Sequence, residues 1–190
     1  NFVNPAITAR VLMLVSFASV AAPAFPAGVD ATAGATPLVQ LANGESVDLL
    51  TLLLGNHGGA VGETCAIALI LGFLYLLARD VISWEIPVSF IGSVFVFSFL
   101  MEGDAMKALA LTLSGGLLLG AIFMATDYVT SPTTPAGKLI FGLGCGLLTF
   151  LIRYFGSYPE GVSFAILIMN LVVPYIDKLT KHRIYGGKKA

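Results

Sequence analysis

The sequence predicts an all-α, polytopic membrane protein, and three observations carry that prediction. Hydrophobic residues make up 57% of the 190 residues, only 11% are charged, and the mean hydropathy is +0.91. A soluble domain carries roughly 25% charged residues, so this chain cannot cover itself with polar surface. The apolar residues also fall into separate runs, each near the roughly 20 residues with which a helix crosses the hydrocarbon core. We therefore expect a single membrane domain over residues 1–190.

The apolar runs predict a transmembrane helical bundle of about six spans. Several runs are short for a full crossing and rich in glycine, which in membranes indicates close helix packing or a helix broken beside a cofactor or substrate. The expected spans are Ala6 to Ala22, Ala60 to Leu77, Ile86 to Met101, Met106 to Thr126, Leu139 to Ile152 and Val162 to Ile176.

The start of the chain indicates a piece of a longer subunit. The first residue is Asn1, and the first apolar run follows almost at once, so we expect an upstream portion. A signal peptide is the competing interpretation, since Arg10 precedes an apolar stretch that ends in small residues. We favour the longer subunit, because a signal peptide is removed from a mature chain.

Basic residues predict the orientation, because Lys and Arg in short loops collect on the cytoplasmic side. Five of the ten lie after the last span, and counting back through six spans places Arg79, Lys138 and Arg10 on the same side. Only Lys107 and Arg153 remain on the other side, eight basic residues against two. We expect a cytoplasmic C-terminus, with the longest loop, residues 23–59, on the outer face of the membrane.

That outer loop is expected to be functional, because a loop of this length in a compact domain usually is. It contains the stretch Asp30-Ala31-Thr32-Ala33-Gly34-Ala35-Thr36-Pro37. Gly34 can take positive φ, and Thr36 is held extended by the proline that follows it. The Thr36 hydroxyl is thereby presented outward, although on the residues alone the stretch is also an ordinary turn. Further along the loop, Val47 to Leu54 indicates a short helix or interfacial segment.

The stretch resembles the flavinylation motif Asp-x-x-Ser/Thr-Gly-Ala-Thr, whose last threonine is esterified to the phosphate of FMN by a flavin transferase. Ala33 departs from the motif, where Ser or Thr is usual. Further segments resemble the C-terminal portion of the D subunit of the Rnf complex, a relative of the B subunit of the Nqr complex, in the same order. They include Gly55-Asn56-His57-Gly58-Gly59, Met124-Ala125-Thr126-Asp127, Tyr158-Pro159-Glu160-Gly161, Pro174-Tyr175-Ile176-Asp177 and Arg183-Ile184-Tyr185-Gly186.

The resemblance implies a membrane electron-transfer subunit of an ion-translocating ferredoxin:NAD⁺ oxidoreductase, in a bacterial or archaeal cytoplasmic membrane. Its partners would be other Rnf-type subunits and a flavin transferase, and its fold would be similar to one half of a urea-transporter-like inverted repeat. FMN would be bound covalently at Thr36, beside Asp30, Gly34 and Ala35. A second, non-covalent flavin and the coupling ion, Na⁺ or H⁺, stay open. The alternative functions are a small-solute channel or transporter of the urea type, and a purely structural subunit.

Four acidic residues at membrane depth or at its edge are candidates for an ion path: Glu63, Asp127, Glu160 and Asp177. Ionisable groups are expensive in membranes and are retained mainly where they face a cavity or an ion path. The structural alternative for Glu63 is a favourable contact with a helix N-terminus, and for the others a solvated boundary position. We expect no metal site, since Cys65 and Cys145 are too few thiolates for an iron–sulfur cluster, and no nucleic-acid partner.

Overall fold

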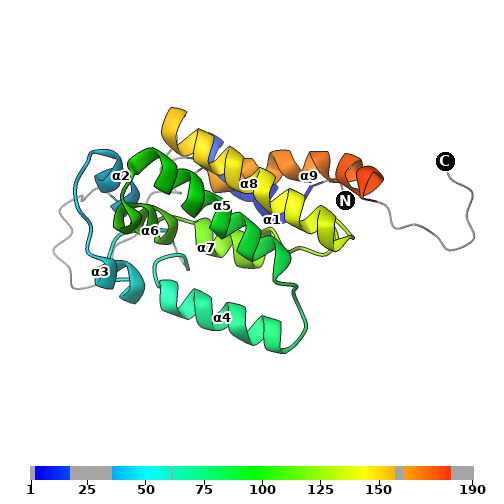
Figure 1. The fold of residues 1–190 in the computed structure, drawn as a ribbon, viewed down its shortest axis with the longest axis horizontal. Coiled ribbons are helices and arrows are strands. Elements are labelled where there is room, and N and C mark those ends of the chain that lie inside the picture. Colours follow the sequence, from blue (N-terminus) through cyan, green and yellow to red (C-terminus); the bar gives the residue numbers. More distant parts are fainter. Residues whose placement is uncertain (1–2, 18–35, 61, 157–160, 181–190) are drawn as a thin grey trace, which may run out of the picture.

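The computed structural model describes residues 3–17, 36–60, 62–156 and 161–180, and every regular element in these ranges is helical (Figure 1). The elements are α1 (Pro5–Ser16), α2 (Pro37–Ala42), α3 (Leu49–Leu54), α4 (Ala66–Ala78), α5 (Glu85–Glu102), α6 (Ala105–Leu113), α7 (Leu117–Leu119), the π-helical turn η1 (Gly120–Met124), α8 (Pro135–Phe155) and α9 (Val162–Leu179).

The all-α membrane fold class is confirmed. Within the part of the chain that the structure describes, three helices, α5, α8 and α9, are long and apolar enough to cross a membrane by length and composition. The helix pair formed by α6 and residues 117–124 adds a fourth span if the bent pair is one crossing. Two further apolar helices, α1 and α4, are shorter. The count of about six spans and the urea-transporter comparison therefore stay predictions.

The centre of the molecule is a stack of long helices. α5 packs against α8 and α6, α8 packs against α9, and α9 packs against α1, whereas α4 lies at the edge and contacts α3 and α7 (Figure 1). The core between these helices is built from fully buried side chains such as Phe90, Phe141 and Ile166. Asn4 starts α1 as its cap, since its Oδ1 accepts from the backbone N–H of Ala6 at 2.9 Å.

Glycine allows α5 and α8 to approach closely. A Cβ added at Gly142 would meet the hydroxyl of Ser89, and one added at Gly146 would meet the hydroxyl of Ser93. Ser93 donates its hydroxyl to the carbonyl of Phe90, 2.9 Å away, so its polar group is satisfied at this contact. Packing through small residues is therefore the correct interpretation of the glycines in α8.

The glycines at 115 and 116 instead mark a broken helix. α6 ends at Leu113 and α7 begins at Leu117, with a bend of 64° between the two helical parts. Gly115 lies at the bend with φ +67°, a conformation that glycine adopts without a steric penalty. The break thus leaves backbone N–H and C=O groups without helical hydrogen-bond partners in the middle of a candidate span. Side chains from other helices must supply those partners.

Candidate functional site

Thr36 immediately precedes α2, and its backbone is extended, with φ −58° and ψ 153°, as expected for a residue before proline. Pro37 occupies the first helical position, where its missing N–H costs nothing. The Thr36 side chain makes no capping hydrogen bond to α2 and is partly exposed, so its hydroxyl is not used to start its own helix. Asp30, Gly34 and Ala35 lie outside the described residues.

The backbone after Thr36 is anchored by α2, an element that sequence reasoning missed. Leu38 and Leu41 are buried in a cluster with Leu52 of α3 and with Ala110 and Leu111 of α6. Pro37 at the first helical position was the available signal, but a six-residue helix has no clear apolar period. The short helix expected within residues 47–54 is confirmed as α3.

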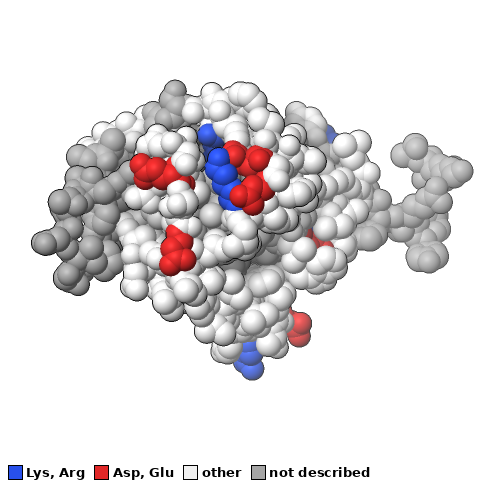
Figure 2. All heavy atoms as spheres, turned by 60° about the vertical axis from the view of Figure 1, so that its left-hand side comes forward, with Lys and Arg blue, Asp and Glu red and all other residues white. Residues whose placement is uncertain are grey.

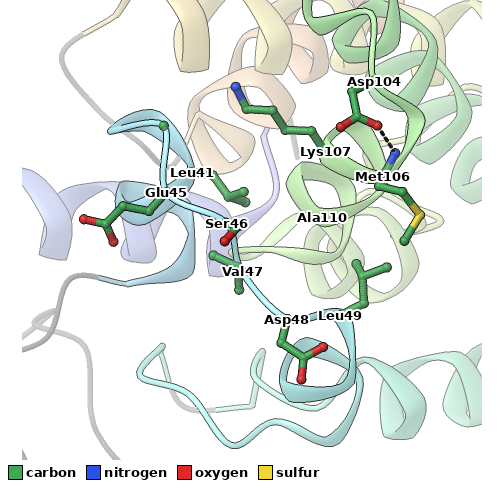
Figure 3. Close-up of a pocket in the computed structure, with 11 residues that line it drawn as sticks. Leu41, Glu45, Ser46, Val47, Asp48, Leu49, Asp104, Met106, Lys107 and Ala110 are labelled. Carbon is green, nitrogen blue, oxygen red and sulfur yellow. Dashed lines mark hydrogen bonds between the residues drawn. The ribbon is translucent and has the colours of Figure 1, made fainter.

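A pocket of about 420 Å³ lies between α2, the turn that follows it and the start of α6. Leu41, Val47 and Ala110 contribute apolar wall, and Ser46 and Lys107 contribute polar groups (Figure 3). Figure 3 shows the Lys107 side chain reaching from α6 toward the side of the pocket formed by α2.

Charged side chains gather at this end of the molecule. Figure 2 shows a basic group flanked by acidic groups on a face that is otherwise largely free of charged residues over its described part. Lys107 forms an ion pair with Glu102, and the Tyr154 hydroxyl donates to the same carboxylate at 3.0 Å. Asp48 and Asp104 cap α3 and α6 by accepting from the backbone N–H groups of Leu50 and Met106.

Glu63 forms a buried ion pair beside the helix break. Its Oε2 lies 2.8 Å from the guanidinium of Arg10, and its Oε1 accepts from the backbone N–H of Ala60 at 3.1 Å. The carboxylate side chain is 2% exposed, and a Cβ added at Gly116 would come within 2.8 Å of it. Glu63 therefore lies before α4 rather than in its first turn, so the helix N-terminus is not its partner.

Arg153 supplies the backbone partners that the break needs. Its guanidinium donates to the carbonyl of Leu111 at 2.7 Å and to that of Ser114 at 3.1 Å, at the C-terminal end of α6. These are carbonyls that a helix end leaves without intrahelical donors. Arg10 and Arg153 thus bind groups of other segments of the chain, so their charges are partly neutralised or hydrogen-bonded within the protein.

Asp127 and Asp177 both accept hydrogen bonds from threonines in the connection between η1 and α8, and Asp127 lies in that connection itself. Asp127 accepts from the Thr130 hydroxyl at 2.9 Å, and Asp177 of α9 accepts from the backbone N–H of Thr133 at 3.1 Å. Neither contact involves the Arg10–Glu63 pair. Glu160 lies outside the described residues.

Comparison with known proteins places the chain in a family. Residues 1–186 match the model of the NQR2, RnfD, RnfE family. The D subunit of the Na(+)-translocating ferredoxin:NAD(+) oxidoreductase complex of Acetobacterium woodii is 43% identical over 196 residues, covering all of this chain and 60% of that protein. The D subunit of the proton-translocating ferredoxin:NAD(+) oxidoreductase complex of Clostridium ljungdahlii is 39% identical over all of this chain and is covered to 62%.

A third relative, the D subunit of the ion-translocating oxidoreductase complex of Stutzerimonas stutzeri, is 38% identical over 98% of this chain and 64% of its own length. The chain thus spans about three fifths of the length of these curated relatives. Identity at this level, together with a family match over nearly the whole sequence, shows common descent. The chain belongs to the NQR2, RnfD, RnfE family.

Proposed function

We propose that this chain is part of a membrane subunit of an ion-translocating ferredoxin:NAD⁺ oxidoreductase and carries FMN as a phosphoester on Thr36. The observation that carries the proposal is the conformation of Thr36: its backbone is extended, and its hydroxyl makes no capping hydrogen bond to α2. Thr36 is also the last residue of the stretch that resembles the flavinylation motif. The names of the relatives support the assignment to an oxidoreductase complex.

The residues around Thr36 suit the attachment of a large group. Bound FMN would supply reversible electron uptake, and the protein would supply position. Pro37 restricts the Thr36 backbone, and the buried leucines of α2 fix the protein end of the tether against α3 and α6. A flavin attached there cannot diffuse away between turnovers. Its partners would be a flavin transferase that recognises Asp30 and the other subunits of the complex.

We infer that Glu63 is the acid most closely tied to the ion path. Coupling-ion sites in transporters are built at discontinuous helices, where unwound backbone and helix ends meet. Glu63 lies against the break between α6 and α7, whereas Asp127 and Asp177 bind a connecting loop. Asp127, Asp177 and Glu160 remain candidates for the ends of that path. The coupling ion stays open between Na⁺ and H⁺, because one relative is named for each.

The flavin proposal is tested by three variants of the full-length subunit co-expressed with a flavin transferase. Thr36→Ala should reduce the fluorescent band on a denaturing gel to background, because the ester oxygen is gone. Thr36→Ser keeps a hydroxyl and should retain part of the band, and Thr32→Ala should leave it unchanged. Membrane insertion should be the same in all three, since Thr36 is outside the buried core. A band that persists in Thr36→Ala would remove Thr36 as the attachment site.

A further inference from the structure

We propose that Asn4 and Asn170 are positioning residues that hold the segment carrying Asp127 in the arrangement in which its carboxylate binds the coupling cation. This inference rests on the place proposed above for Asp127 at an end of the ion path, and it adds a role for two uncharged side chains. Both are buried, with 6% and 3% of their surface exposed. Asn170 lies within α9, a candidate membrane span, where polar side chains hydrogen-bond across helices.

The two asparagines bind the chain on either side of Asp127. Asn4 lies immediately before α1, and its Nδ2 donates to the carbonyl of Met124 at 3.1 Å. The Asn170 amide donates to the carbonyl of Thr130 at 3.3 Å, in the orientation that pairs both of its polar ends. Met124 and Thr130 lie three positions before and three positions after Asp127. Both ends of the segment at residues 124–130 are therefore fixed to other helices.

The two asparagines also bind each other, so the two ends of the segment are held by one network. The side-chain oxygen of Asn170 accepts from the backbone N–H of Asn4 at 3.2 Å. Met124 is the last residue of η1, and its carbonyl is one of those that a helix end leaves without an intrahelical donor. A buried network whose groups are all paired is rigid, whereas the loss of one amide leaves a buried carbonyl without its donor.

The fixed segment orients the Asp127 carboxylate through Thr130. The Thr130 hydroxyl donates to Oδ2 of Asp127 at 2.9 Å, and the Asp127 carbonyl accepts from the backbone N–H of Ser131 at 3.0 Å. Thr130 thus contacts Asn170 through its carbonyl and Asp127 through its hydroxyl. A binding group must be held to within about 0.5 Å by the residues behind it. Loss of either asparagine amide should therefore weaken cation binding at Asp127.

The test measures the half-saturating concentration of the transported cation in complexes assembled with variants of the full-length subunit. Turnover is recorded in lipid vesicles while Na⁺ or pH is varied, whichever ion the unaltered complex transports. Asn4→Ser keeps an oxygen that can cap α1 but loses the amide donor to Met124. Asn170→Ala removes the other donor. Ser163→Ala is the matched control, because Ser163 is also buried in α9 and takes part in none of the contacts above.

We expect the half-saturating concentration to rise severalfold in Asn4→Ser and Asn170→Ala and to stay unchanged in Ser163→Ala. Thr130→Val should raise it by a similar factor, and the double variant with Asn170→Ala should be no worse than the larger single effect, because both act on one carboxylate. A purely structural role would lower the amount of assembled complex without moving this concentration. If Asn170→Ala does not assemble, Asn4→Ser alone decides the outcome.

Asp127→Asn separates the failure of this inference from the failure of the ion-path proposal. It should raise the half-saturating concentration further or abolish the cation-dependent turnover. An effect of Asp127→Asn together with unchanged values in both asparagine variants would overturn the positioning role and leave the ion-path proposal intact. An unchanged value in Asp127→Asn would remove Asp127 from the ion path, and the positioning role with it.

Discussion

The Arg10–Glu63 ion pair places two opposite charges where little water reaches them. The Glu63 side chain is 2% exposed and that of Arg10 is 19% exposed. Removing one partner of a buried pair leaves an uncompensated charge, whereas removing both with residues of similar volume is often close to neutral. The pair therefore contributes more to holding the helix break in one arrangement than to net stability.

This pair gives a prediction at the residue scale. Glu63→Leu should destabilise the full-length subunit by about 3–5 kcal/mol, and Arg10→Met by a similar amount, because each removes the ion-pair partner of a charge that is largely shielded from water. The double variant should be more stable than either single one. The melting temperature of the purified subunit in detergent measures these effects, and costs that simply add in the double variant would show that the two residues are not coupled.

Individual site residues differ in how far the sequence could predict them. The prediction of Thr36 rests on a local signal, a motif of consecutive residues and a following proline; its extended backbone is confirmed, and its role stays a prediction. Arg10 was predicted at the inner end of the first span, and its ion pair with Glu63 was not predicted, because the two residues lie 53 positions apart in the sequence. The hydrogen bonds of Arg153 were not predicted for the same reason, since its acceptors at Leu111 and Ser114 are 42 and 39 positions away. Contacts between distant segments leave no local pattern.

At the scale of elements, apolar runs predicted every long helix. The glycines in these runs did not by themselves show whether they allow close helix packing or break the helix. In α8, glycines admit the serines of α5, and the helix continues through them. At Gly115 the backbone takes positive φ and the helix breaks. The difference depends on what faces each glycine: the side of a neighbouring helix in α8, or a guanidinium that donates to the freed carbonyls at the break.

The α5–α8 contact gives a prediction with an internal control. Gly146→Ala should destabilise the subunit by about 1–3 kcal/mol, because the added methyl group overlaps Ser93. Gly92→Ala in the adjoining α5 should be neutral or stabilising by roughly 0.5–1 kcal/mol, since nothing lies within 4 Å of its added Cβ. Ser93→Ala should recover part of the loss in the Gly146 variant. Thermal unfolding compares the four proteins, and equal melting temperatures for the two glycine variants would contradict the close packing.

At the scale of the whole molecule, the charges that remain outside the core support the proposed orientation. Once Arg10 and Arg153 are set aside, Lys107 is the one basic residue expected on the outer face, beside α2 and the pocket. The opposite end carries Lys138, which donates to Ser83, and Lys178 in the last turn of α9. The fold class followed from composition, whereas the number of crossings did not, because α1 and α4 are too short to decide by length.

The orientation is tested by cysteine labelling in intact cells. Cys65 and Cys145 are first replaced by serine and alanine, and a single cysteine is then introduced at Asn43 or at Tyr128, both of which are exposed. A membrane-impermeant reagent should label Asn43→Cys directly and Tyr128→Cys only after the membrane is opened, because they lie in the outer and inner loops of the proposed topology. The reverse order of labelling would contradict the orientation. It would place Thr36 on the cytoplasmic face, where an exported flavin transferase could not reach it.

The central claim is that Thr36 carries FMN, and the most direct measurement is the mass of the native peptide spanning Asp30 to Leu41. The protein is isolated from its own membranes, digested and fragmented in a mass spectrometer. We expect a peptide heavier by FMN less one water, with the added mass on Thr36 and none on Thr32. A native peptide of unmodified mass, from membranes in which the transferase is active, would contradict the claim.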